Sequence, residues 1–128
     1  MPRILLVEDV DVVRSVLRRM LERSGHAVTE ANDGREALEK LGAERFDLMI
    51  TDIWMPGMDG IALIGAARQR HPAISIIAVS GGAPRAPQAF SIQEARSAGA
   101  DDTLLKPVDR DELMRAVDRL LPRAGAAG

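Results

Sequence analysis

The chain has 128 residues, no cysteine, and a formal net charge of −2. This length suits one domain, and the lack of cysteine excludes disulfides, Cys-ligated zinc and thiol catalysis. The charge gives no reason to expect a nucleic acid or an anionic membrane as a partner. With one Trp and two Phe, stacking on bases is not expected either. The amino terminus resembles neither a signal peptide nor a membrane span, so we expect a cytoplasmic protein.

Short apolar runs alternate with amphipathic segments from one end of the chain to the other. In chain order the pattern predicts a strand at Ile4–Val7, a helix at Asp11–Ser24, a strand at Ala27–Ala31, a helix at Gly34–Leu41, a strand at Phe46–Thr51, a helix at Ile61–Arg70, a strand at Ile74–Val79, a helix at Gln88–Ala98, a strand at Thr103–Leu105 and a helix at Asp109–Leu121. Gly25 and Gly42 suit the ends of the first two helices. Asp109 and Glu112 have the spacing of a capping box.

Strict alternation of strands and helices predicts a parallel sheet covered by helices on both faces. At this length the favoured topology is a flavodoxin-like, doubly wound α/β fold with five strands in the order 2-1-3-4-5 and five helices. We expect the domain to occupy residues 1–121. Residues 122–128 are predicted to form a short flexible tail, and the segment GGAPRAP at residues 81–87 a flexible loop.

Polar residues follow the predicted strands where each strand ends. Glu8 and Asp9 follow the first strand, Asp52 the third, Ser80 the fourth and Lys106 the fifth. Ligands of open parallel sheets bind beyond the carboxyl ends of the strands. Each motif alone is typical of an ordinary turn or helix cap, but all of them at successive strand ends indicate one site.

The chemistry of this group favours phosphoryl transfer to an aspartate. Crowded carboxylates repel one another unless a cation lies between them, and oxygen ligands favour Mg²⁺. Lys106 can pair with a phosphoryl oxygen as a point charge, and the hydroxyl of Ser80 can donate to another. Positioning and charge neutralisation are most of what phosphoryl transfer requires. A carboxylate such as that of Asp52 is a competent nucleophile for it.

Through these residues the chain resembles the receiver domain of two-component response regulators, of the single-domain, chemotaxis-regulator-like type. The matching motifs are Glu8-Asp9, DIWMPGMDG with Asp52, Ser80-Gly81, and GADDTLLKP with Lys106-Pro107. The resemblance covers the chain from Ile4 to Leu121. It implies that Asp52 is the phosphoacceptor, and that the phosphoryl group comes from a histidine kinase or a histidine phosphotransfer protein.

The resemblance also implies roles for the other residues of the site. Glu8, Asp9, Asp52 and the backbone carbonyl of Trp54 are expected to bind Mg²⁺. Ser80 is expected to move towards the phosphoryl group and Lys106 to pair with it. The protein would then catalyse only its own phosphorylation and dephosphorylation, without turnover of small substrates.

Two departures from the family pattern concern the response to phosphorylation. Thr103 occupies a position where family members usually carry an aromatic residue that swings inward. The stretch between Ser80 and Lys106 is also longer than is common. We therefore expect GGAPRAP and the start of the following helix, including Phe90, to carry most of the switch.

No output domain is expected after the receiver, so the protein would signal by docking on an unknown downstream protein or by onward phosphotransfer. The first predicted helix carries four arginines, at Arg14, Arg18, Arg19 and Arg23. They form either a solvated helix face or part of a docking surface for the kinase or phosphotransfer protein.

Three other functions compete with this interpretation. A flavin-binding protein could share the fold, but the chain lacks a Gly-rich phosphate loop and aromatic residues to spare. A Mg²⁺-dependent phosphohydrolase would usually need an acid/base Asp two residues after Asp52, where this chain has Trp54. A receiver-like domain that works without phosphorylation is disfavoured by the intact acidic set.

Overall fold

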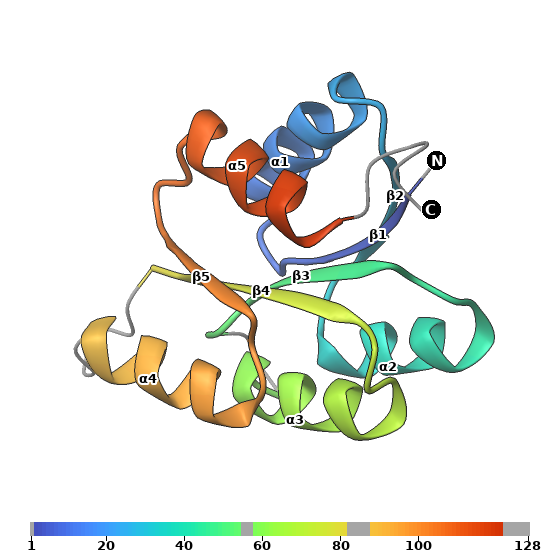
Figure 1. Ribbon diagram of the computed structural model, residues 1–128, viewed down its shortest axis with the longest axis vertical. Coiled ribbons are helices and arrows are strands. Elements are labelled where there is room, and N and C mark those ends of the chain that lie inside the picture. Colours follow the sequence, from blue (N-terminus) through green and yellow to red (C-terminus); the bar gives the residue numbers. More distant parts are fainter. Residues whose placement is uncertain (1, 55–57, 82–87, 122–128) are drawn as a thin grey trace.

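The computed structural model describes residues 2–54, 58–81 and 88–121, with side chains in the last range from residue 92 onward. Its elements are β1 (Arg3–Val7), α1 (Asp11–Arg23), β2 (Ala27–Ala31), α2 (Gly34–Ala43), β3 (Leu48–Asp52), α3 (Gly60–Arg70), β4 (Ser75–Ser80), α4 (Gln88–Ala98), β5 (Asp102–Leu105) and α5 (Arg110–Leu120). The five strands are parallel and lie in the order β2-β1-β3-β4-β5 (Figure 1). The predicted flavodoxin-like fold is confirmed.

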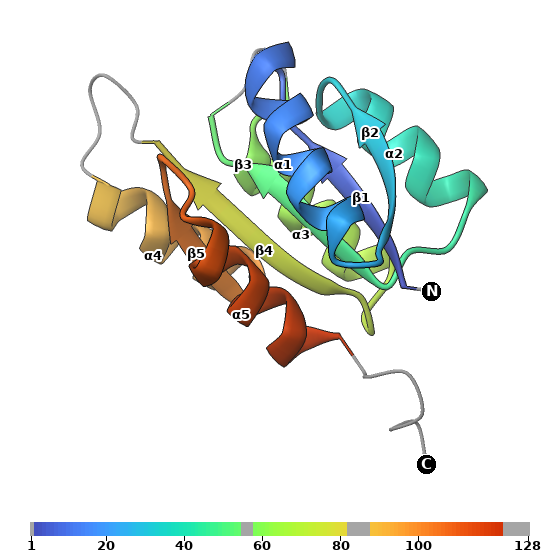
Figure 2. The same cartoon turned by 90° about the horizontal axis from the view of Figure 1, so that it is seen from above.

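The sheet separates two helix layers, with α1 and α5 on one face and α2, α3 and α4 on the other (Figures 1 and 2). Successive strand side chains point to opposite faces. In β1, Ile4 and Leu6 therefore pack under α1 and α5, whereas Leu5 and Val7 pack against α2 and α3. Because both faces are buried, the central strands are continuous apolar runs.

Most predicted boundaries lie within one residue of the observed ones, but two of them are wrong by two residues for local reasons. β3 begins at Leu48, because Phe46 is a buried lead-in residue beneath the Arg3 guanidinium, whose carbon lies 5.3 Å from the ring centroid. Gly42 lies inside α2, which continues to Ala43. Gly25, in contrast, follows α1 with φ 90°, as a helix terminator should.

Asp109 caps α5 as predicted, since its side chain accepts a hydrogen bond from the Glu112 backbone N–H. Residues 55–57 and 82–87, which include most of GGAPRAP, and the predicted tail at 122–128 lie outside the described residues. Among the residues that the structure does describe, no helix is both long and apolar enough to cross a membrane.

A close approach between α3 and the end of β3 fixes the backbone beside Asp52. The Gly60 N–H donates to the Ile53 carbonyl at 2.7 Å. A Cβ on Gly60 would lie 2.6 Å from the Ile53 Cα and closer still to the Asp52 carbonyl oxygen. Backbone cannot move aside as a flexible side chain can, so only glycine fits here.

We predict that Gly60→Ala destabilises the protein by about 1–3 kcal/mol, because overpacking forces backbone shifts of that cost. Gly65→Ala in the same helix is the matched control, since a Cβ there meets nothing within 4 Å. It should instead stabilise the helix by up to about 1 kcal/mol. Urea denaturation measures both, and equal effects of the two substitutions would contradict this account of Gly60.

Candidate functional site

The sheet register brings the predicted site residues to one rim. Val7 pairs with Thr51, so Glu8 and Asp52 follow at the same level on neighbouring strands. Asp52 pairs with Val79, which places Ser80 one residue further along β4. Ser80 in turn pairs with Leu105, immediately before Lys106. The convergence of these residues, predicted from the strand ends, is confirmed.

Lys106 connects the outer strand to the centre of the rim. Its Nζ donates to Glu8 Oε1 at 2.7 Å and to Asp52 Oδ2 at 2.9 Å. To reach them its stem passes Gly81, where a Cβ would lie 3.0 Å from the Lys106 Cδ. The Lys106 backbone N–H donates to the Ser80 carbonyl at 2.9 Å, which fixes the start of that stem. This role of Gly81 was not predicted from the sequence, although its position directly after Ser80 was a signal.

Glu8, Asp9 and Asp52 form a carboxylate cluster. One carboxylate oxygen from each lies within 4.8 Å of the other two. Glu8 is 1% exposed and Asp52 6% exposed, so neither carboxylate is well solvated. Burial, followed by the hydrogen bond to Glu8, raises the pKa of Asp9 above its ordinary value. Like charges are therefore crowded at this rim.

Lys106 offsets part of this charge. Burial alone lowers the pKa of Lys106, but its hydrogen bonds to Glu8 and Asp52 and their charges raise it overall. Lys106 is therefore a cation in the folded protein. When all three carboxylates are ionised, three negative charges face one ammonium, which leaves two uncompensated.

The donor set of the cluster fits a hard divalent cation. Oxygen ligands are those that Mg²⁺ and Ca²⁺ take in proteins. Because Mg²⁺ holds oxygens at about 2.0–2.1 Å, two direct ligands on opposite sides of the ion are about 4.2 Å apart. The spread of 4.8 Å in the cluster is close to that span. The residues present could therefore hold such an ion.

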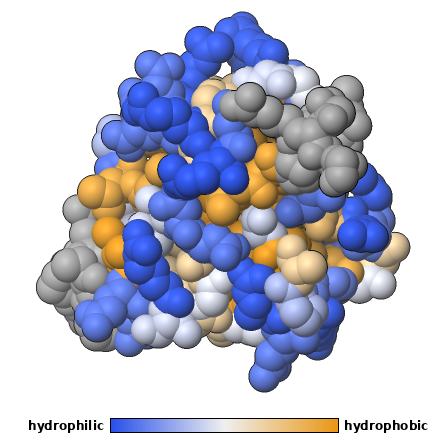
Figure 3. Space-filling view, in the orientation of Figure 1, coloured by the Kyte–Doolittle hydropathy of each residue, from blue (hydrophilic) through white to orange (hydrophobic). Residues whose placement is uncertain are grey.

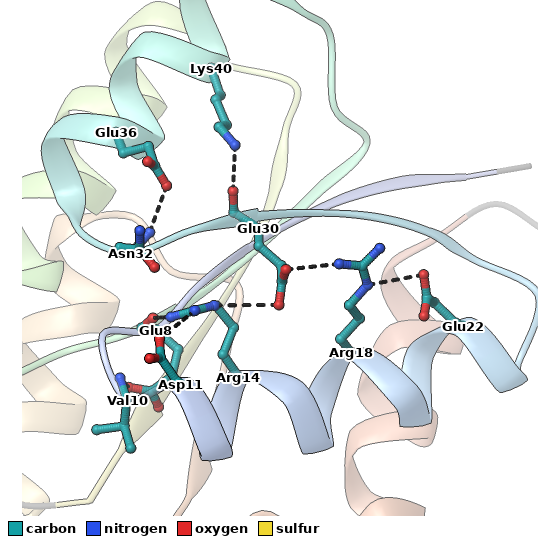
Figure 4. Close-up of polar contacts among 10 residues, drawn as sticks. All are labelled: Glu8, Val10, Asp11, Arg14, Arg18, Glu22, Glu30, Asn32, Glu36 and Lys40. Carbon is teal, nitrogen blue, oxygen red and sulfur yellow. Dashed lines mark hydrogen bonds and ion pairs between the residues drawn. The ribbon is translucent and has the colours of Figure 1, made fainter.

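One of the two interpretations of the arginines on α1, a solvated helix face, is wrong for Arg14. Its side chain is 12% exposed, so it does not belong to a solvated arginine face. Its Nη1 donates to the Glu8 carbonyl oxygen at 2.7 Å, and its Nε lies 3.4 Å from Glu30 Oε1 (Figure 4). Burial lowers the pKa of Arg14, but Asp11 and then Glu30 raise it overall. Arg14 thus stays charged beside the acidic loop.

The other predicted residues lie around the rim. Ser80 is fully buried at the end of β4, and Trp54, two residues past Asp52, is 38% exposed. Thr103 is partly buried in β5, where it pairs with Ala78. Phe90 belongs to α4, but its side chain lies outside the described residues. The roles of Trp54, Thr103 and Phe90 remain predictions.

Comparison with known families decides what kind of domain carries this rim. The sequence model of the response regulator receiver domain matches residues 4–118. The chain belongs to the response regulator receiver family. The phosphoryl-accepting aspartate is general in this family, and the carboxylate rim of this receiver domain is consistent with it.

Curated relatives of this receiver domain include transcriptional regulators. It is 36% identical over 125 residues to the transcriptional regulatory protein CseB of Streptomyces coelicolor, which covers 98% of the chain and 51% of CseB. It is 36% identical over 116 residues to the DNA-binding transcriptional regulator NtrC of Escherichia coli, which covers 91% of the chain and 24% of NtrC. The chain thus spans about half or less of these relatives.

Solved structures show the same fold. The chemotaxis protein CheY4 of Vibrio cholerae has a TM-score of 0.84 at 32% identity, over 94% of this chain and 99% of that one. The response regulator TrrA of Thermotoga maritima, in a complex with Mg²⁺ and BeF, has a TM-score of 0.79 at 31% identity, over 94% of this chain and 100% of that one. The receiver fold is therefore shared over nearly the whole chain.

Proposed function

We propose that this receiver domain accepts a phosphoryl group on Asp52 in a Mg²⁺-dependent reaction. The contact of Lys106 with both Glu8 and Asp52 supports this most directly, because it aims the ammonium at the carboxylate that would react. The similarity to TrrA, which was solved with Mg²⁺ and BeF, supports the same chemistry. The phosphoryl donor would be a histidine kinase or a histidine phosphotransfer protein.

In this mechanism a carboxylate oxygen of Asp52 forms a bond to phosphorus while the bond from phosphorus to the donor histidine nitrogen breaks. The nitrogen keeps the electron pair of the broken bond. Lys106, already 2.9 Å from Asp52 Oδ2, would pair with an oxygen of the new phosphoryl group. The hydroxyl of Ser80, on the neighbouring strand end, would donate to another of its oxygens.

Glu8, Asp9, Asp52 and the Trp54 carbonyl would hold the Mg²⁺ ion. When bound, Mg²⁺ supplies positive charge that offsets the negative charge on the oxygens of the phosphoryl group. The buried Glu8 keeps its carboxylate orientation through two contacts, from Lys106 Nζ and from the Val10 backbone N–H. Asp9, in the loop after β1, and Asp52, at the end of the neighbouring β3, each bring a carboxylate oxygen to the same cluster.

Receiver domains in general do not turn over small substrates, and we propose that the chemistry at Asp52 is limited to its own phosphorylation and dephosphorylation. Membership of this family argues against a flavin site or a phosphohydrolase. The signal would pass to a downstream protein or a phosphotransfer protein, and a cytoplasmic location remains a prediction.

The donor would dock beside Asp52 on α1 and the start of α5. An apolar hollow of about 390 Å³ lies there, lined on the α1 side by Val12 and Val16 and on the other by Pro107 and Val108. Arg19, Arg23 and Arg110 line the adjoining hollow. In Figure 3 hydrophilic side chains cover the upper part of the molecule, where α1 lies in Figure 1. An amphipathic helix with acidic residues flanking its apolar stripe would complement this surface.

The acceptor assignment is tested with a small phosphodonor such as acetyl phosphate. With Mg²⁺ present, we predict that the intact mass rises by one phosphoryl group and that Asp52→Asn abolishes the rise. Asp47→Asn is a control, because Asp47 lies at the other end of β3, where it accepts from the Arg3 backbone N–H. Undiminished labelling of Asp52→Asn would overturn the assignment, and no labelling of the parent protein would favour a domain that works unphosphorylated.

The docking surface is tested by charge reversal. Arg19→Glu with Arg23→Glu should slow phosphotransfer from the cognate donor by about 10-fold or more at low salt, because complementary charges steer association. Labelling by acetyl phosphate should not change. Arg35→Glu is the control, since Arg35 is exposed on α2, on the opposite face of the sheet. Equal loss with both phosphodonors, or none with the protein donor, would contradict the proposed surface.

A further inference from the structure

The peptide group between Glu8 and Asp9 is held by an arginine that comes from the next helix. Arg14 Nη1 donates to the Glu8 carbonyl oxygen at 2.7 Å. That carbonyl lies in the rigid plane that also contains the Asp9 nitrogen and Cα. The Glu8 N–H is already fixed by the Ala31 carbonyl at 3.1 Å. The direction in which the Asp9 side chain leaves the backbone therefore depends on the contact from Arg14.

Arg14 is itself held in place on two further sides. Its Nη2 donates to Asp11 Oδ1 at 2.6 Å, and its Nε lies 3.4 Å from Glu30 Oε1. The other oxygen of Glu30 accepts from Arg18 Nη1 at 2.8 Å. Figure 4 shows the Glu30 carboxylate between the two arginines, with Arg14 reaching on to Glu8. A chain of contacts thus runs from strand β2 through one guanidinium to the acidic loop.

We propose that Arg14 is a positioning residue for the metal site, which sets the Glu8–Asp9 peptide so that the Asp9 carboxylate faces Asp52. This inference rests on the proposed Mg²⁺-dependent function. A planar guanidinium suits the task, because its fork donates hydrogen bonds to the Glu8 carbonyl and to Asp11 at fixed angles, while its Nε lies at ion-pair distance from Glu30. The 12% exposure of the side chain leaves it little freedom to leave that position.

The charge of Arg14 should weaken Mg²⁺ binding, whereas its contact with the Glu8 carbonyl should strengthen it. A cation beside a cation site disfavours Mg²⁺ by repulsion, so a purely electrostatic role predicts tighter binding once Arg14 is neutralised. A positioning role predicts weaker binding. The sign of the change in Mg²⁺ affinity therefore separates the two effects.

The test is calorimetric titration of Mg²⁺ into the parent protein, Arg14→Gln and Arg14→Lys. Removing contacts that orient metal ligands typically costs about 10–100-fold in affinity, and we expect about 10-fold weaker binding for Arg14→Gln. Arg14→Lys keeps the charge but loses the fork, so it should also bind more weakly. Tighter binding by Arg14→Gln with unchanged binding by Arg14→Lys would show that only charge matters and would overturn the proposal.

Arg18→Gln is the matched control, because Arg18 lies one turn further along α1 and pairs with Glu30 and Glu22 but not with Glu8. Because Arg18 contacts Glu30 but not the Glu8 carbonyl, its loss should weaken Mg²⁺ binding much less than Arg14→Gln does. Urea denaturation in EDTA reports stability separately. A loss of stability in the Arg14 variants with unchanged Mg²⁺ affinity would reduce Arg14 to a structural residue and overturn the proposal.

Glu30→Gln provides a variant outside α1 and completes a double-mutant cycle. If Glu30 acts through Arg14, Glu30→Gln should weaken Mg²⁺ binding in the parent and have little further effect in Arg14→Gln. Additive effects would contradict this relay from Glu30 through Arg14.

The variant Asp9→Asn separates a failure of this inference from a failure of the proposed function. If Asp9→Asn binds Mg²⁺ as tightly as the parent, the metal site itself is wrong. If Asp9→Asn alone weakens binding, only the role of Arg14 fails.

Discussion

The rest of the site depends on one constraint, the repulsion among three carboxylates at the strand ends. Glu8, Asp9 and Asp52 crowd within 4.8 Å, and two of them are almost fully buried. Buried carboxylates are costly unless they are paired and hydrogen-bonded. Lys106 supplies the pairing that the chain itself can offer, and a bound cation would supply the rest. The site is thus poised to take up positive charge.

Several local features exist to hold that arrangement. Gly60 lets α3 approach the end of β3, and Gly81 lets the stem of Lys106 pass towards Glu8. The partly buried Arg14 holds the backbone between two of the acids. Phosphorylation would bring new oxygens to Asp52 that compete with Glu8 for Lys106, because one ammonium has only three donors. The ion pair that stabilises the metal-free rim is therefore also the contact most open to rearrangement.

Much of this could be predicted from the sequence, because parallel strands buried on both faces produce apolar runs whose ends are easy to locate. The polar residues at those ends, from Glu8 to Lys106, were found in that way. The place of Arg14 was not predicted in that way. The 3.6-residue period puts Arg14 and Arg18 on one helix face, but it does not tell which of the two side chains is withdrawn from solvent. Phe46 was assigned to a strand because an apolar residue before Leu48 looks the same whether it pairs or packs under Arg3. The inward movement of Ser80 and the parts of Thr103 and Phe90 in the switch stay predictions, since they concern a phosphorylated state.

Lys106 and a divalent cation should compensate the same carboxylates, and thermal unfolding of Lys106→Met across a Mg²⁺ titration measures this. Removing one partner of a buried ion pair costs about 3–5 kcal/mol, and less where the partner is partly exposed, as the 23% exposed side chain of Lys106 is. The account predicts a lower unfolding midpoint without Mg²⁺, tighter Mg²⁺ binding and a larger rise in the midpoint on saturation than in the parent protein. An unchanged midpoint without Mg²⁺ together with unchanged Mg²⁺ affinity would contradict it.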